Sequence, residues 1–291
     1  MQSPIANNKK QMVRLDSHQH FWRYSPAEYD WIDDSMAAIR RDFMPEDLKH
    51  EMDAAGFDAS VVVQVRQTLE ETRWLLELAD INPFVVGVVG WVDLQSPAVN
   101  DELDSLMAHR ALVGIRHIVQ AEPDGFLARP AFERGIAAMT ARDLPYDLLV
   151  YARQIAAADS LVAQHPEQRF LLDHLGKPDI RGGQYDAWRR DFDRLAAQPN
   201  VWCKLSGLVT EADWRRWTPG QLRPYLDHAL EAFGPSRLMI GSDWPVCTLA
   251  ASYRETMAVV IDALSEYSAD EQAQVLSGTA RAFWNLVEFP V

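Results

Sequence analysis

The chain has 291 residues, of which 48% are hydrophobic and 24% charged, and its formal net charge at pH 7 is -14. A chain of this composition can bury a large core and lacks the low hydrophobicity of disordered proteins. The acidic balance, with no run of more than two basic residues, excludes nucleic acid and anionic membrane surfaces as expected partners and favours a small-molecule substrate.

The N-terminal residues, the longest apolar stretch and the cysteines indicate where we expect the protein to be located. Residues 1–11 have no apolar segment of the signal-peptide type, so we expect a flexible leader. The longest apolar stretch, FVVGVVGWV at 84–92, is far shorter than the ~20 residues needed to cross a bilayer, and no membrane span is expected. Cys203 and Cys247 lie far apart and form no CxxC pair, which is typical of reduced packing thiols in a cytoplasmic protein.

Short apolar runs alternate eight times with amphipathic stretches of helical period, several of which begin with Pro or end with Gly, Asn or Pro. The apolar runs show little alternation, which predicts strands buried on both faces. In chain order the predicted strands are MVRLDSHQHF (12–21), ASVVVQV (59–65), FVVGVVGWV (84–92), ALVGIRHIV (111–119), YDLLVYA (146–152), RFLLDHLG (169–176), VWCKLSGL (201–208) and RLMIGSDW (237–244).

Strands that alternate with helices pair in parallel through right-handed crossovers, and eight such units have the count and size of a closed (β/α)8 TIM barrel. A doubly wound open sheet is the alternative, but DSHQHFWRYSP after the first strand contains no glycine for a phosphate loop. No linker composition divides the chain. We therefore predict one domain over 1–291, with residues 22–43 forming a long loop after strand 1 that could cover the site.

Polar residues gather at the C-terminal ends of the predicted strands, where the active sites of such barrels lie. His18 and His20 stand two apart in strand 1, so their rings leave the same face. His174 ends strand 6 and Asp243 ends strand 8, which neighbours strand 1 once a barrel closes. We predict that these four residues form one catalytic site.

Three imidazoles and one carboxylate suit Zn2+ or a similar divalent ion. The same side chains could instead orient a water molecule and an ester without a metal, and the residues leave both possibilities open.

Neighbouring residues on a strand point to opposite faces, so only one of Arg116 and His117 can face the barrel. The same alternation applies to Asp173 beside His174, and an Asp173 that faces the helices is an equally open interpretation. Lys204 could be a cation at the mouth of strand 7 or a lysine at the edge of the core whose ammonium reaches solvent, and we favour the second interpretation.

Further side chains near the strand ends are candidates for substrate binding. Tryptophans there could line a pocket for a ring-shaped ligand, and amide, guanidinium, imidazole and phenol groups could bind its oxygens. The candidates are Trp22, Gln64, Arg66, Trp91, Arg116, His117, Tyr151 and Trp244.

The ordered motifs DSHQHFW, VVGWVDL, GIRH, LLDHLGKP, KLSGL, MIGSDWP and SGTARAFWNL resemble those of the amidohydrolase superfamily. More narrowly they resemble its sugar lactonase branch, which includes L-fuconolactonases and L-rhamnonolactonases, over residues 12–288. The resemblance implies a (β/α)8 barrel that hydrolyses C–O or C–N bonds with water activated by Asp243. It also matches His18 and His20 to the HxH pair of strand 1 and His174 to the histidine of strand 6.

The chain departs from the superfamily pattern at two places. ALVGIRHIV offers no lysine to be carboxylated and bridge two metals, and YDLLVYARQ lacks the metal-binding histidine after strand 5. A two-metal centre is therefore not expected, which leaves a single metal such as Zn2+ or none.

The resulting hypothesis is a hydrolase that opens a sugar lactone, such as L-fuconolactone, to the aldonic acid. The first alternative is a superfamily member that hydrolyses a pyrone or muconolactone carboxylate, or decarboxylates a related acid. Those substrates should require several arginines at the strand ends, and only Arg66 and Arg116 are present there. The second alternative is a non-catalytic sugar-binding barrel.

Overall fold

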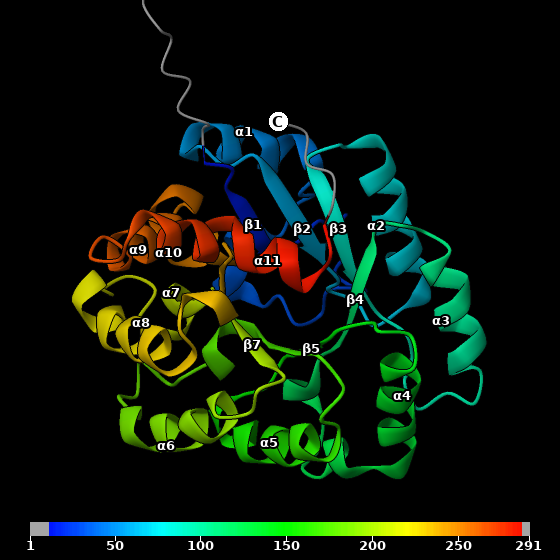
Figure 1. Cartoon of the computed structure of the whole chain (residues 1–291). Coiled ribbons are helices and arrows are strands. Elements are labelled where there is room, and N and C mark those ends of the chain that lie inside the picture. Colours follow the sequence, from blue (N-terminus) through cyan, green and yellow to red (C-terminus); the bar gives the residue numbers. More distant parts are fainter. Residues whose placement is uncertain (1–11, 287–291) are drawn as a thin grey trace, which may run out of the picture.

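Eight parallel strands stand in sequence order around the centre of the molecule (Figure 1), in a computed structural model that describes residues 12–286. The predicted (β/α)8 barrel is confirmed. The strands are β1 (Leu15–Gln19), β2 (Ala59–Val63), β3 (Val85–Gly90), β4 (Leu112–His117), β5 (Tyr146–Leu148), β6 (Phe170–Leu172), β7 (Val201–Leu205) and β8 (Leu238–Ile240).

Amphipathic helices surround the strands. Prolines occupy the first position of α1, α4 and α8, where a missing N–H costs no helical hydrogen bond. The helices are α1 (Pro45–Ala55), α2 (Leu69–Ile81), α3 (Val99–Met107), α4 (Pro130–Thr140), α5 (Ile155–Gln164), α6 (Tyr185–Ala196), α7 (Leu208–Glu211), α8 (Pro219–Phe233), α9 (Tyr253–Ala263), α10 (Ala269–Ala273) and α11 (Thr279–Phe283).

The apolar residues form two clusters separated by the sheet. On β2, Val61 and Val63 belong to the inner cluster, and Val62 belongs to the outer cluster between the strands and the helices. Phe283 and Trp284, at the end of α11, pack with the inner cluster, and α11 lies across the strands in Figure 1 (red). The barrel is therefore a filled core rather than a channel, as in other barrels of this size.

Strands β8 and β1 close the barrel through the segment that follows β8. The amide of Asp243 donates to the carbonyl of His18 at 2.8 Å, and the amide of His20 donates to the carbonyl of Trp244 at 2.7 Å. The Asp16 carboxylate accepts from the Ser242 amide at 2.9 Å and from its hydroxyl at 2.6 Å. Side-chain hydrogen bonds thus supplement a short ladder, and they hold Asp243 against the strand that carries the HxH pair.

All eight strands are shorter than the predicted apolar runs, and three of them are very short. β5, β6 and β8 have three residues each, whereas the apolar runs extend to 152, 176 and 244. The backbone leaves the sheet where it enters the left-handed region, with φ of 54° at His174 and 57° at Asp243. Apolar runs do not reveal this change, because the residues that follow β6 and β8 are still buried.

The loop over residues 22–43 is closed at its base by two hydrogen bonds between the backbones of Trp22 and Phe43, at 3.0 and 2.9 Å.

The predicted leader, 1–11, lies outside the described residues. Within 12–286, every helix is too short or too polar to traverse a lipid bilayer.

Gly241 permits the close approach of β8 to β1, because a Cβ atom there would lie 2.8 Å from the Cβ of His18. We expect Gly241→Ala to lower the free energy of unfolding by about 1–3 kcal/mol through overpacking. Gly220→Ala is the matched control: the nearest atom to its new Cβ lies 4.0 Å away, and in a helix the change should stabilise by about 0.5–1 kcal/mol. Denaturant unfolding measures both, and equal midpoints for the two variants would contradict the expectation.

Candidate functional site

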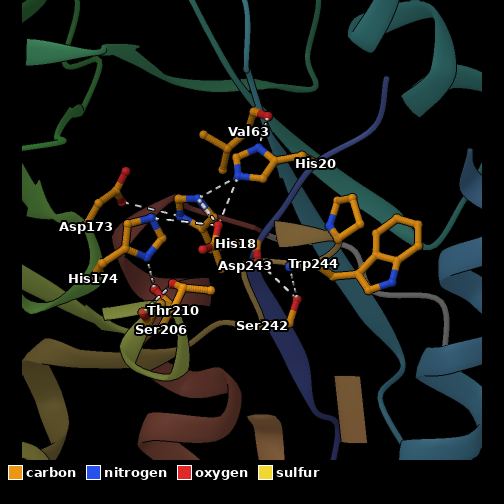
Figure 2. Close-up of polar contacts among 12 residues, drawn as sticks. His18, His20, Val63, Asp173, His174, Ser206, Thr210, Ser242, Asp243 and Trp244 are labelled. Carbon is orange, nitrogen blue, oxygen red and sulfur yellow. Dashed lines mark hydrogen bonds and ion pairs between the residues drawn. The ribbon is translucent and has the colours of Figure 1, made fainter. Parts of the chain in front are cut away.

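Three imidazoles and one carboxylate converge at the carboxyl end of the barrel (Figure 2). His18 and His20 lie at the end of β1, His174 follows β6 and Asp243 follows β8. The Nε2 atoms of His18 and His20 are 3.2 Å apart. Asp243 Oδ1 lies 3.2 Å from Nε2 of His20, 3.8 Å from that of His18 and 3.9 Å from that of His174. The structure therefore brings together the four residues predicted to form one site.

Each ring is oriented by a partner of its other nitrogen. Nδ1 of His20 donates to the carbonyl of Val63 at 2.7 Å, which leaves a lone pair on its Nε2 whenever the ring is neutral. Nδ1 of His174 lies 2.8 Å from the hydroxyl oxygen of Ser206. Such partners of metal-binding histidines fix both the tautomer and the ring orientation. The Nε2 atoms are thereby directed toward the common centre.

His18 has two partners at Nδ1, the carboxylate of Asp173 at 3.4 Å and the ammonium of Lys204 at 3.2 Å. The carboxylate can only accept a hydrogen bond and the ammonium can only donate one. The surroundings of His18 therefore accommodate either tautomer, with the proton on Nδ1 facing Asp173 or with a lone pair on Nδ1 facing Lys204.

A left-handed turn follows β6. Because of this turn, Asp173 and His174 do not point to opposite faces as neighbours on a strand would. His174, Leu175, Gly176 and Lys177 all have positive φ, between 50° and 68°. This turn directs His174 into the site, while Asp173 also remains inside the barrel, fully buried. The open interpretation of Asp173 as a residue facing the helices is wrong.

Beneath His18 lies a buried network of two cations and two carboxylates. Lys204 Nζ is 2.5 Å from Asp147 Oδ2 and 3.0 Å from Asp173 Oδ1, and Arg116 donates to Asp173 at 3.0 Å. Lys204 has no exposed surface. Our interpretation of Lys204 as a lysine that reaches solvent is therefore wrong. Opposite charges balance in this network, as buried ionic groups require.

Burial determines which of these groups carry charge. It lowers the pKa of His174 to about 4, and together with Lys204 it lowers the pKa of His18 well below the ordinary value. Burial alone would raise the pKa of Asp243, but the surrounding imidazoles of His174, His20 and His18 hold it below its usual range. Neutral imidazoles beside an ionised carboxylate are the protonation states that bind a metal.

The geometry of three of the four donors, those of His18, His20 and Asp243, fits one divalent metal ion. In a tetrahedral site with bonds of about 2.0–2.2 Å, ligand atoms lie roughly 3.3–3.6 Å apart. The atoms of His18, His20 and Asp243 are separated by 3.2, 3.2 and 3.8 Å. Two lone pairs that face each other across 3.2 Å repel unless a proton or a cation lies between them. One feature opposes an ion, because Nη1 of Arg116 lies 3.3 Å from Nε2 of His18.

A cavity of about 300 Å³ opens onto this cluster. Its walls are largely apolar, and two glutamines add neutral amides. The lining residues are His20, Trp31, Val65, Gln67, Arg116, Ile118, Gln120, Ala121, Leu149, His174, Lys177, Asp243 and Val246.

Of the eight predicted substrate-binding residues, only Arg116 lines this cavity. Gln64 is buried, and its amide donates to the carbonyl of Arg116 at 3.1 Å. Arg66 turns away to pair with Glu28 at 2.9 Å and lines a separate surface cavity. Tyr151 is 38% exposed and lines another cavity, beside Arg153.

Of the neighbours Arg116 and His117, Arg116 is the one that faces the cavity. His117 Nδ1 accepts from the indole of Trp91 at 3.2 Å, and its Nε2 lies 2.8 Å from Glu122. The ring also stacks on Phe126. Both nitrogens of His117 are therefore engaged outside the cavity, and Trp91 is held there with it.

Trp22 and Trp244 are core residues rather than walls of the cavity. Trp22 has no exposed surface, and its indole donates to the carbonyl of Arg41 at 2.9 Å. Trp244 is 2% exposed and packs edge-on against Phe43. Trp31, which sequence reasoning missed, is the tryptophan that lines the cavity. Its place in the irregular loop 22–43 gave no periodic signal, although that loop was expected to cover the site.

Other missed residues include Gln67, Gln120 and Lys177. Gln67 lies two positions beyond Val65, so extending the alternation of strand 2 would have placed both on one face. Gln120 lies beyond the end of β4 and Lys177 ends the left-handed turn, and neither position follows from strand periodicity.

A barrel whose carboxyl end gathers imidazoles around an aspartate has the position and the donor set of an enzyme active site. Residues 15–286 match the amidohydrolase family. The chain is 43% identical over 288 residues to the L-fucono-1,5-lactonase of Burkholderia multivorans, covering 95% of this chain and 97% of that enzyme. It is 39% identical over 280 residues to the L-fucono-1,5-lactonase of Burkholderia ambifaria, covering 94% and 96%.

A solved structure of an amidohydrolase from Burkholderia multivorans with bound Zn is 43% identical, with a TM-score of 0.90 and coverage of 94% of this chain and 99% of that one. This chain therefore belongs to the amidohydrolase family, as the resemblance of its motifs implied.

Proposed function

We propose that this protein is a lactonase that hydrolyses a sugar lactone, with L-fucono-1,5-lactone as its model substrate, to the aldonic acid. The observation that carries the proposal is the position of Asp243, ionised among three imidazoles at the base of a cavity, in a chain 43% identical to an L-fucono-1,5-lactonase. The two free, buried cysteines support a cytoplasmic location, where thiols stay reduced.

The walls of the cavity favour a neutral deoxysugar lactone over a dicarboxylate. Trp31 offers a flat apolar face, and Val65, Ile118, Leu149 and Val246 add aliphatic surface. Sugar rings have apolar C–H faces, and the methyl group of a deoxysugar is apolar as well. The amides of Gln67 and Gln120 can bind hydroxyl groups.

The cations of the cavity are already paired. Arg116 donates to Asp173, and Lys177 Nζ lies 3.2 Å from Glu211. A pyrone dicarboxylate would bring two negative charges to a cavity with little uncompensated positive charge, and we therefore favour the sugar lactone.

The reaction needs a base, a stabiliser of negative charge and a proton for the leaving group. Asp243 takes a proton from water, and the hydroxide adds to the lactone carbonyl carbon. The ring C–O bond then breaks, and Asp243 returns the proton to the leaving alkoxide. The product is the open-chain aldonic acid, which ionises in water.

We assign one divalent ion, Zn2+, to His18, His20, His174 and Asp243. Held there, it would polarise the lactone carbonyl and lower the pKa of water. The ligand atoms of His18, His20 and Asp243 form one close group, and His174 Nε2 lies 3.9 Å from Asp243 Oδ1 as the fourth candidate donor. The other close group, His18, Asp173 and His174, is a poorer site, because Lys204 and Arg116 already neutralise Asp173.

A panel of lactones tests the substrate class. We expect kcat/KM for L-fucono-1,5-lactone to exceed that for a pyrone dicarboxylate by about 100-fold or more, because the cavity lacks free cations for two carboxylates. Acid release in a weakly buffered indicator solution measures both rates. Thermal stabilisation by the sugar lactone without any turnover would overturn the proposal and identify a sugar-binding barrel instead.

Substitution of Asp243 tests the proton transfer. Asp243→Asn should reduce kcat by about 10³-fold, because the amide cannot accept the proton from water. Asp93→Asn is the control, since Asp93 lies outside the cavity and accepts from the amide of Gln95 at 2.9 Å. Wild-type turnover in Asp243→Asn would remove this residue from the central role.

Removal of the metal tests the assignment of the ion. Protein dialysed against a chelator should lose its Zn2+ and at least about 90% of its kcat, and one equivalent of Zn2+ should restore both. Elemental analysis and acid release on the same samples provide the measurement. Full turnover in protein with no measurable metal would show that the side chains act alone.

A further inference from the structure

Lys177 reaches the same cavity as His174 through the left-handed turn after β6. Both residues line the cavity, and the amide of Lys177 donates to the carbonyl of His174 at 2.8 Å. In a tight helical turn, residues three apart lie on the same side. The turn therefore presents His174 and Lys177 together.

The backbone of this turn is costly. His174, Leu175 and Lys177 are non-glycine residues in the left-handed region, and each such residue costs about 1–2 kcal/mol. Strain of this kind persists where the surrounding structure enforces it, and it is concentrated at functional sites. The strain orients two side chains that both line the cavity, which motivates a role for Lys177 beyond a surface ion pair.

The ammonium of Lys177 has a donor to spare. Its Nζ lies 3.2 Å from Glu211 Oε1 and 3.3 Å from Gln120 Oε1, and an ammonium has three N–H donors.

Arg116, the other cation of the cavity, directs its Nη1 and Nη2 atoms to residues of the barrel interior. Its guanidinium donates to Asp173 at 3.0 Å and to the carbonyl of Gln64, and it contacts His18 at 3.3 Å. Arg116 is 3% exposed and its unpartnered Nε is buried, whereas Nζ of Lys177 has two oxygen partners for three N–H donors, so Lys177 is the better candidate to donate to a ligand.

We propose that Lys177 contacts the substrate and donates a hydrogen bond to an oxygen on the carbonyl carbon of the lactone. This inference rests on the proposed lactonase function. The same carbon bears the carbonyl oxygen of the lactone, the oxyanion of the tetrahedral intermediate and the carboxylate of the product. Because negative charge grows on these oxygens, the contact strengthens along the reaction and favours the transition state over the bound lactone.

The test compares Lys177→Met with Arg153→Met. Arg153 is a matched control because Arg153 and Lys177 each lie 5.6 Å from the centre of the Tyr151 ring. Arg153 pairs with the exposed Asp124 and does not line the cavity. We expect Lys177→Met to lower kcat/KM by about 10- to 100-fold, mainly through kcat, since hydrogen bonds to charged groups are worth this factor. Arg153→Met should keep both constants.

Binding of the product provides a readout independent of turnover. Calorimetric titration with L-fuconate should show about tenfold or greater loss of affinity in Lys177→Met and none in Arg153→Met. Unchanged affinity and unchanged kcat in Lys177→Met would overturn the inference and leave the lactonase function standing. A wild-type protein that binds L-fuconate through Lys177 but turns over no lactone would overturn the function and keep the contact.

A second variant separates contact with the substrate from a structural ion pair. The double variant Lys177→Met/Glu211→Met removes both members of the pair and leaves no unpaired charge. If Lys177 served only to neutralise Glu211, the double variant would regain wild-type kcat and L-fuconate affinity, which would overturn the inference. We expect both to remain as low as in Lys177→Met.

Discussion

The closure of β8 onto β1 is the constraint on which the site depends. The Asp16 carboxylate accepts two hydrogen bonds from Ser242, and two backbone hydrogen bonds join residues 18 and 20 to residues 243 and 244. These contacts place an aspartate from the end of the chain within 3.2 Å of a histidine from its beginning. The lack of a side chain at Gly241 allows the two backbones to approach.

The barrel is organised in layers along its axis. Trp284 and the inner aliphatic residues form an apolar layer, and Lys204 lies between that layer and the site, 5.5 Å from the Trp284 ring. The charged network of Lys204, Asp147, Asp173 and Arg116 comes next, and it contacts the imidazole of His18. A network of paired buried charges resists displacement, because any displaced member would leave an uncompensated charge. The network thus fixes the orientation of the His18 ring through Lys204, Asp173 and Arg116.

Strand periodicity predicted the barrel and the convergence of His18, His20, His174 and Asp243, because both follow from parallel strands whose carboxyl ends share one mouth. It could not predict the walls of the cavity. Alternation fails after β6, where non-glycine residues adopt left-handed conformations that no residue type announces. The tryptophans show the same limit: Trp22 and Trp244 adjoin strands but fill the core, whereas Trp31 comes from an irregular loop.

Several walls of the cavity come from loops that carry none of the four clustered residues His18, His20, His174 and Asp243. Trp31, Gln67, Gln120 and Leu149 belong to segments after β1, β2, β4 and β5, whereas the cluster lies at the end of β1 and in the turns after β6 and β8. Replacing residues in these loops would therefore alter the shape offered to a ligand without shifting the reacting groups. Natural or laboratory evolution could therefore adapt this chain to other cyclic esters by changing the loops after β1, β2, β4 and β5 and keeping the four clustered residues.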